Sequence, residues 1–141
     1  MARSAVDVVR TVEEIWDQGK LDELNGFFAA DFNANANLPG LPAGLEGAKL
    51  AHQAALQSFP DRRVEVVDIF GEGERVCVRC RVTGTNQGGI APLGVEPNGK
   101  PIDFEWISIY RVKGGRIVEH WAINDALTLM TQLGAIPAPG M

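Results

Sequence analysis

The sequence predicts an α+β fold, in which three N-terminal helices pack on a curved and mostly antiparallel sheet. Two observations support this fold class. Before Pro60, apolar residues recur at the three- and four-residue spacing of helices, whereas after it β-branched residues alternate with polar ones. Pro60 itself marks the change, because proline cannot continue a helix. A run of helices followed by a run of strands is typical of α+β proteins.

The first helix is expected to begin after Ser4, a good N-cap residue, and to end at Gly19. Its apolar face carries residues 5, 8, 9, 12, 15 and 16. A short second helix is predicted over 21–28, a short strand over 31–37, and a third helix over 45–59. The glycine- and proline-rich segment between this strand and the third helix is interpreted as a loop.

Four antiparallel strands are predicted after Pro60. Lys113, Gly114 and Gly115 form the tight turn of the last hairpin, and the residues between the second and third of these strands form a long loop. A short amphipathic helix follows the last strand. The predicted strands are residues 63–70, 75–85, 102–112 and 116–124.

Length and composition limit the possible functions. A chain of 141 residues is expected to form one domain, assigned here to 1–134 with a flexible tail over 135–141. The net charge of −5 and the scattered basic residues argue against nucleic-acid binding. Apolar runs are too short for a membrane span, and Asp7 interrupts any signal-peptide pattern, so a cytoplasmic protein is expected.

Metal and cofactor motifs are absent from the sequence. Cys77 and Cys80 have CxxC spacing, but they lie on an alternating strand and therefore face opposite sides of the sheet. Two unpaired cysteines are expected. The sequence has no GxGxxG, P-loop, GxSxG or HExxH motif, so we expect neither a metal site nor a nucleotide cofactor.

The most informative segment is the last strand. His120 shares a face with Ala122 and Asn124, and Asp125 falls where strand gives way to helix. Asp125 could turn inward and form an acid–base pair with His120, or it could cap the following helix. The second alternative, with a buried structural histidine, is the more common arrangement. His52, on the third helix, is expected at the surface or its boundary.

Alternation also predicts the two faces of the sheet. Phe104, Trp106, Ser108 and Tyr110 share the face that suits a concave surface under the helices. The opposite face is charged and apolar, and it could be either a homodimer interface or a solvated surface. The residues expected on it are Arg79, Arg81, Glu105, Ile107, Ile109 and Arg111, with Glu105 paired to one of the two strand arginines.

Several short pieces resemble one protein family in their order and spacing. The strongest are Gly94-Val-Glu-Pro-Asn-Gly-Lys100 and Gly115-Arg-Ile-Val-Glu-His-Trp121, followed by Gln132-Leu-Gly134. Between about Val8 and Gly134, the chain resembles the SnoaL-like polyketide cyclases of the nuclear transport factor 2-like superfamily. The resemblance implies a cone-shaped α+β barrel with a deep apolar pocket, frequent homodimers and chemistry without a cofactor.

The sequence also departs from that family at functional positions. In the aldol-condensing members, a catalytic aspartate is expected at the position of Ala122 and a pocket histidine at that of Ser108. The Gly-Thr-His of many relatives is Gly-Thr-Asn86 here. An aldolase-type mechanism is therefore not predicted. The Glu-His-Trp-x-Ile-x-Asp form, ending in Met-x-x-Gln-Leu-Gly, resembles more closely the indane-ring-forming cyclase of the indanomycin pathway.

The expected function is a cofactor-independent cyclase, of lyase or isomerase type, that acts mainly by positioning an apolar polyketide-like intermediate of antibiotic biosynthesis. Two alternatives remain: a non-catalytic small-molecule-binding protein, and a hydroxylating or epoxide-opening relative. The candidate catalytic residues are His120 and Asp125. The candidate substrate-binding residues are Phe59, Val82, Asn86, Trp106, Ser108, Tyr110, Ala122 and Asn124.

Overall fold

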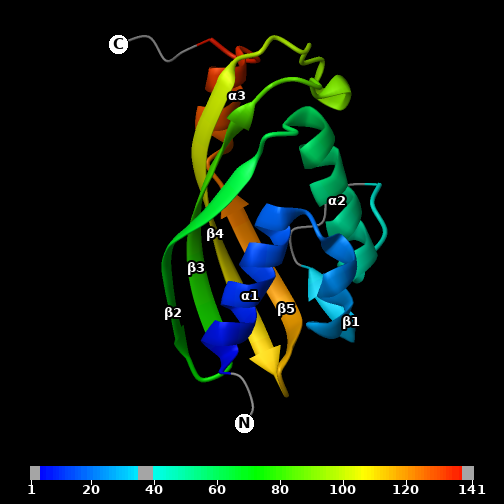
Figure 1. Cartoon of the computed structure of the whole chain (residues 1–141), viewed down its shortest axis with the longest axis vertical. Coiled ribbons are helices and arrows are strands. Elements are labelled where there is room, and N and C mark those ends of the chain that lie inside the picture. Colours follow the sequence, from blue (N-terminus) through cyan, green and yellow to red (C-terminus); the bar gives the residue numbers. More distant parts are fainter. Residues whose placement is uncertain (1–3, 35–39, 138–141) are drawn as a thin grey trace.

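The sheet is the frame of the molecule and confirms the predicted α+β class. The structure is a computed structural model that describes residues 4–34 and 40–137. The sheet has five strands in the order β1-β5-β4-β3-β2, is curved and is not closed (Figure 1). All pairs of neighbouring strands are antiparallel except β1 and β5. The strands are β1 (Phe28–Ala34), β2 (Arg63–Glu72), β3 (Arg75–Thr85), β4 (Pro101–Lys113) and β5 (Arg116–Asn124).

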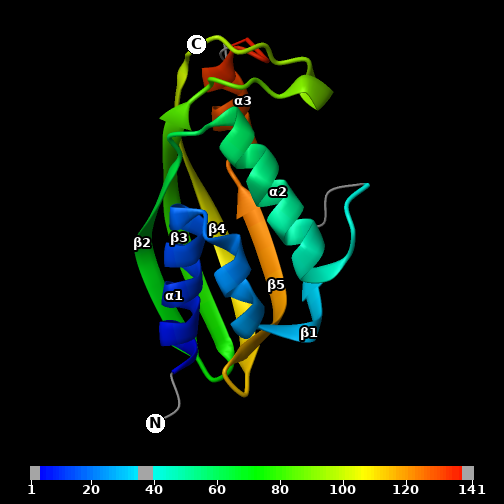
Figure 2. The same cartoon turned by 45° about the vertical axis from the view of Figure 1, so that its right-hand side comes forward.

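The helices cover the concave side of the sheet and its end. Helix α1 packs across β2, β3 and β4, helix α2 crosses in front of β5, and α3 closes the end where α2 also finishes (Figure 2). The α-helices are α1 (Ala5–Gln18), α2 (Gly44–Ser58) and α3 (Ala126–Leu133), and two 3-10 helices are η1 (Leu21–Gly26) and η2 (Ala91–Leu93). None of the described helices is long and apolar enough to cross a membrane.

Helix α1 begins and ends where its sequence predicts. The Ser4 hydroxyl accepts a hydrogen bond from the Asp7 backbone N–H at 3.1 Å, which satisfies one of the free donors of the first turn. Gly19 ends the helix with φ of 73°, a left-handed conformation that glycine adopts without steric cost. The apolar stripe between these caps packs on the sheet, with Val8, Val9 and Val12 almost fully buried.

The largest difference from prediction lies in the segment after α1. The second helix, expected over 21–28, is only the 3-10 helix η1, and Phe28 already begins a strand. That strand, expected over 31–37, is β1, and residues 35–37 lie outside the described part. It pairs in parallel with β5, the last strand of the chain. Such a pairing between distant segments leaves no local signal in the sequence.

Strands β3 and β4 pair residue for residue and fix the two faces of the sheet. Val76 lies opposite Tyr110, Val78 opposite Ser108, and Cys80 opposite Trp106. These side chains point to the concave side, as the alternation predicts. Cys80 is buried and the half-buried Cys77 lies on the other face, and both are free thiols.

The core consists of two clusters that meet at Trp106. The larger one fills the space between α1, η1 and the concave side of the sheet. The smaller one lies at the end of the molecule near α3, and Trp106 packs against both. The smaller cluster comprises Phe59, Val82, Val95, Ile102, Phe104 and Leu133. Of the predicted tail, residues 138–141 lie outside the described part.

Candidate functional site

A cavity of about 140 Å³ lies on the concave side of the sheet, beside Trp106 where the two core clusters meet. Helix α1 and helix α2 form one wall, and strands β4 and β5 form the other. The exposed Asn124 marks one end of the cavity, and the nearly fully buried Glu13 and Tyr110 mark the other. Its lining residues are Glu13, Trp16, His52, Trp106, Ser108, Tyr110, His120, Ala122 and Asn124.

Glu13 is a carboxylic acid on the apolar face of α1. It falls between Val12 and Trp16 in the helical stripe, so the periodicity of α1 turns its side chain toward the sheet. Only 2% of the residue is exposed. The Tyr110 hydroxyl donates to Glu13 Oε1 at 2.8 Å, and the Cys80 thiol donates to Glu13 Oε2 at 3.6 Å.

Burial raises the pKa of Glu13 from 4.5 to about 7, against the lowering effect of the Tyr110 and Cys80 hydrogen bonds and of the Arg62 charge. The donors keep their own protons near neutral pH, since burial raises the pKa of both Tyr110 and Cys80. Glu13 is thus the one of these three groups that exchanges a proton near pH 7. A carboxyl group poised in this way can take up or release a proton during a reaction.

His52 completes the helix-side wall. Its ring stacks on that of Trp16, with 3.7 Å between the ring centroids and planes 9° apart. The buried Arg62 donates from Nη2 to the Trp16 carbonyl at 2.8 Å and contacts His52 Nδ1 at 3.2 Å. Since arginine can only donate, Nδ1 must accept, and the neutral imidazole carries its proton on Nε2. Burial, with the Arg62 charge next, lowers the pKa of His52 to about 3 and favours this neutral form.

His120 lies on the sheet side of the cavity. Its ring stacks on Tyr110 with 4.3 Å between centroids and planes 15° apart, because the two residues are direct neighbours on β5 and β4. Burial lowers the pKa of His120 to about 4, so the imidazole is neutral at physiological pH. A neutral imidazole here can exchange a hydrogen bond with a bound molecule but is a poor acid.

Six of the ten predicted site residues line this cavity together. These residues, which come from β4 and β5, are Trp106, Ser108, Tyr110, His120, Ala122 and Asn124. Phe59 and Val82 instead belong to the smaller core cluster near α3. They lie outside the cavity because they are packed against Ile102 and Phe104 further along the sheet.

Asp125 and Asn86 also lie outside the cavity, and both have structural partners. Asp125 is the N-cap of α3, where it accepts from the Thr128 N–H at 3.2 Å and from the Thr128 hydroxyl at 2.6 Å. The structure therefore shows the helix cap and not the inward-turned alternative. Asn86 is fully buried in the long loop, where its amide donates to the Glu96 carbonyl and its oxygen accepts from the Gly89 N–H.

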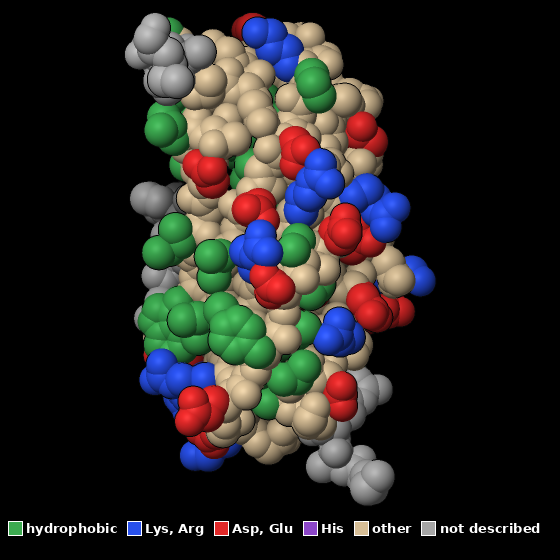
Figure 3. All heavy atoms as spheres, turned by 90° about the vertical axis from the view of Figure 1, so that its left-hand side faces the viewer, with side chains coloured by type: hydrophobic (Ala, Val, Ile, Leu, Met, Phe, Trp, Pro, Cys, Tyr) green, Lys and Arg blue, Asp and Glu red, His purple; other side chains and the backbone are tan. Residues whose placement is uncertain are grey.

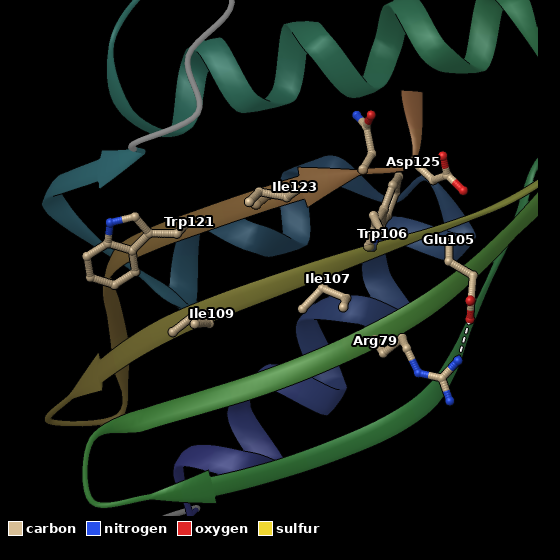
Figure 4. A pocket seen from close by; sticks show the side chains of 10 residues that line it. Arg79, Glu105, Trp106, Ile107, Ile109, Trp121, Ile123 and Asp125 are labelled. Carbon is tan, nitrogen blue, oxygen red and sulfur yellow. Dashed lines mark hydrogen bonds and ion pairs between the residues drawn. The ribbon is translucent and has the colours of Figure 1, made fainter. Parts of the chain in front are cut away.

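A wider groove of about 460 Å³ lies on the outer side of the sheet (Figure 4). Trp106, Ala122 and Asn124 line both the groove and the cavity, so the two hollows adjoin at the end of β5. Among the described residues, the pairing of β1 with β5 stops at His120, and the end of β5 beyond it pairs with β4 alone. The groove floor is apolar and includes Ile107, Ile109, Trp121 and Ile123.

Apolar side chains gather on the outer face of the sheet, both within the groove and outside it (Figure 3). Phe70 is 64% exposed and Ile123 is 80% exposed, and both Ile107 and Ile109 are exposed as well. Ion pairs surround them. Arg79 bonds both Asp68 and Glu105, as predicted for Glu105, and Arg81 pairs with Asp103. The face is therefore charged and apolar, as the alternation predicts.

Sequence reasoning missed the helix side of the cavity: Glu13, Trp16 and His52, with Arg62 behind them. His52 does lie at a boundary, as expected, but its ring faces the cavity. A signal for Glu13 existed, because a charged residue inside the apolar stripe of an amphipathic helix is unusual. Within residues 4–34 and 40–137, no cluster of three His, Cys, Asp or Glu side chains could hold a metal ion.

Comparison with known proteins places the chain in one family. The profile described as SnoaL-like polyketide cyclase matches residues 6–133. Among solved structures, IdmH from Streptomyces antibioticus, described as a candidate polyketide cyclase, is 33% identical with a TM-score of 0.81, over 94% of this chain and 99% of that one. A candidate polyketide cyclase from Bacillus cereus is 32% identical with a TM-score of 0.80, over 94% and 81%.

AclR from Streptomyces galilaeus, described as a candidate hydroxylase, is also similar to this chain. It is 26% identical with a TM-score of 0.81, over 96% of this chain and 84% of that one. The comparison with curated proteins finds no match.

Proposed function

We propose, on the premise that the chain belongs to the SnoaL-like polyketide cyclase family, that it cyclises an apolar polyketide-like intermediate without a cofactor. Membership in the family and its similar structures support a cyclase-type enzyme. The observation that carries the finer proposal is the apolar cavity with a few polar groups on the concave side of the sheet. Fold alone does not determine function, but an apolar hollow with a few polar groups is typical of a small-molecule site.

The size of the hollows bears on how a substrate would bind. The cavity of about 140 Å³ holds only a ring or a short chain, whereas pockets for drug-sized ligands are on the order of 300–1,000 Å³. The adjoining groove of about 460 Å³ provides the additional space. In our proposal the reacting part of the substrate enters the cavity past Ala122, and the rest lies along the groove at the end of β5. Holding a flexible chain in one reactive fold lowers the barrier to ring closure.

The polar groups of the cavity would orient the substrate. His120 and Ser108 line its sheet side and Asn124 its mouth, where they can hydrogen-bond a substrate carbonyl. Asp125 is engaged with Thr128 as a helix cap, so we propose no proton transfer by it. Ala122 and Ser108 stand where the aldol-condensing relatives are expected to keep their catalytic groups. These two residues leave space instead.

The experiment is an incubation of the purified protein with linear polyenes and with poly-β-keto esters, followed by chromatography and mass spectrometry. Cyclisation gives a product of unchanged mass, or one that has lost water, with a new retention time. Ala122→Phe should abolish it by filling the cavity, whereas Val67→Phe, which adds the same ring on the exposed outer side of β2, should not. Binding without conversion would instead favour the non-catalytic alternative. Oxygen insertion would favour a hydroxylase, the activity given in the description of AclR.

We also propose that the protein is a homodimer joined through the outer sheet face, with Arg79, Arg81, Ile107 and Ile109 at the contact. The second copy would cover the groove floor, and the substrate would use the end of the groove at Ala122 and Asn124. The exposed apolar side chains ringed by charged pairs support this interpretation, since such patches often mark interfaces. Sedimentation should give a dimer mass for the wild type and a monomer mass for Ile109→Lys. Leu127→Lys, a similar change at an exposed leucine on α3, is the control and should stay dimeric. A monomeric wild type at all concentrations would refute this proposal.

A further inference from the structure

Glu13 is the feature that neither the family comparison nor the predicted site accounts for. A leucine in its place on α1 would continue the apolar stripe formed by Val9, Val12 and Trp16. Burying a carboxyl group costs free energy, and its hydrogen bonds offset that cost only in part. Stability therefore does not explain why this position is acidic. A role in the chemistry of the cavity would.

The geometry brings Glu13 to the inner end of the cavity, where a bound molecule would meet it. Glu13 lines the same hollow as His120, Ser108 and Ala122. Tyr110 holds one carboxyl oxygen at 2.8 Å, and Cys80 contacts the other at 3.6 Å. The two donors fix the orientation of the carboxyl group without neutralising its charge.

Glu13 also faces a second hollow, which connects it to the surface. This hollow of about 180 Å³ lies between α1 and β2 and is lined by Glu13, Arg10, Glu14, Asp17, Val64 and Val66. Arg10 and Glu14 are exposed. A group that gives and takes protons in every turnover must re-equilibrate with water. The position of Glu13 between the two hollows provides a route for that exchange which does not pass through bound substrate.

We propose that Glu13 is the proton-transferring group of this cavity, and that its substrates carry an enolisable C–H bond next to a carbonyl group. The inference rests on the proposed function and replaces the carboxylate missing at Ala122 with one supplied from the opposite wall. Tyr110 acts as a positioning residue, because it holds the carboxyl group and does not itself accept the proton.

In ring closure within one molecule, the new C–C bond joins the carbon next to one carbonyl group to the carbon of a second carbonyl group. The Glu13 carboxylate removes a proton from the carbon beside one carbonyl, and the C–H electron pair becomes the C=C bond of an enolate, with the charge on oxygen. The enolate carbon attacks the second carbonyl and forms the new C–C bond. The resulting alkoxide takes the proton back from Glu13. His120, Ser108 and Asn124 are the hydrogen-bonding groups near the developing charge.

The groups that face Glu13 come from every surrounding element. They are Arg10, Glu14 and Asp17 on α1, His52 on α2, Arg62 before β2, Cys80 on β3, Tyr110 on β4 and His120 on β5. His52 and His120 are neutral at pH 7, since burial lowers their pKa to about 3 and about 4. A proton transfer with a midpoint near pH 7 therefore reports Glu13, for which burial sets the pKa at about 7.

The test uses a probe that does not require the natural substrate. 5-Nitrobenzisoxazole is small, flat and apolar, and a base that removes its C3 proton opens the N–O bond to give a coloured cyanophenolate. The wild type should accelerate this reaction with a rate that rises with pH around a midpoint near 7. Glu13→Gln should lose the acceleration, by about 100-fold. Glu23→Gln, which makes the same change at an exposed glutamate on η1 away from both hollows, is the control and should retain it.

Two further results decide between Glu13 and its neighbours. Tyr110→Phe should move the midpoint upward, because it removes a hydrogen bond that lowers the pKa of Glu13, and a merely structural tyrosine would not move it. No acceleration in the wild type, or an acceleration that survives Glu13→Gln and has its midpoint near 4, would overturn the proposal. The second result would assign the base to a histidine. If Glu13→Gln does not fold, the wild-type midpoint and its shift in Tyr110→Phe decide.

Failure of this inference can be separated from failure of the proposed function. Acceleration of the probe by Glu13, with no conversion of any polyene or keto ester, would remove the cyclase and retain the proton-transferring site. Cyclisation of a polyene that Glu13→Gln does not slow would retain the cyclase and remove Glu13 from its mechanism.

Discussion

Polar groups on the two sides of the sheet lie in opposite environments. On the concave side, Glu13, His52 and His120 are enclosed. Burial raises the pKa of Glu13 and lowers the pKa of both histidines, and each shift favours the neutral form. On the outer face, Arg79 and Arg81 lie in water, and their carboxylate partners stabilise the charged form. Enclosed groups become neutral or reactive, whereas exposed groups stay charged and pair. The sheet thus has the candidate site on one side and a charged, solvent-exposed surface on the other.

The largest difference in stability between the two faces is expected when the same carboxylate is placed on each face of β3. Val78→Asp introduces it on the concave side, where the residue is 0% exposed, and should reduce the free energy of unfolding by about 4 kcal/mol or more. Cys77→Asp introduces it one residue earlier on the outer side and should change it by no more than about 1 kcal/mol. Urea denaturation of both variants measures the difference. Equal losses would show that the two faces are equally enclosed.

A second, smaller effect is expected from Glu13→Gln and depends on pH. The folded-state pKa of about 7 lies above the ordinary 4.5, so Glu13 favours folding most below pH 4.5 and loses this contribution as the pH rises to 7. The variant, which cannot ionise, should be more stable than the wild type by about 3 kcal/mol at pH 8 and nearly equal to it at pH 4.5. Thermal or urea unfolding at the two pH values tests this. A constant difference would mean that Glu13 has an ordinary pKa.

His52 and His120 also contribute to the pH dependence of stability. Their folded-state pKa values are lowered, so their contribution is complete above pH 6.5 and is lost as the pH falls toward 4. Between about 4.5 and 6.5, Glu13 and the histidines therefore act in opposite directions in the wild type. Because one carboxyl group offsets only one of the two histidines, stability should fall with acid about half as steeply in the wild type as in Glu13→Gln.

The smallest effect is expected on the outer face. Arg79→Gln removes the ion pairs with Asp68 and Glu105, whose partly exposed side chains already interact well with water. The loss of stability should be smaller than in the two preceding experiments, and it should shrink further in salt because the charges are screened. Urea midpoints at low and high ionic strength measure it. A salt-independent loss would indicate that this arginine is packed rather than merely paired.

Much of the sheet and part of the site could be predicted from local pattern. Period-two alternation put Tyr110, His120 and Asn124 on one face of neighbouring strands, and the structure brings them together around one cavity. The same reasoning gave no position for Phe59 and Val82 along the sheet. They belong to the smaller core cluster because α2 ends there and α3 returns to cover it. Alternation assigns a face, but distance along that face depends on how helices cross it.

The sequence by itself determined most of the elements and which face of β3, β4 and β5 is buried, because helical and strand periods, the Ser4 cap and the Gly114-Gly115 turn are local properties. Only the tertiary structure decided that β1 joins the sheet beside β5 and that Glu13 meets Tyr110, 97 residues later. These outcomes depend on contacts between distant segments. A carboxyl group acquires its proton-exchanging character from what is packed around it, and no local pattern contains that information.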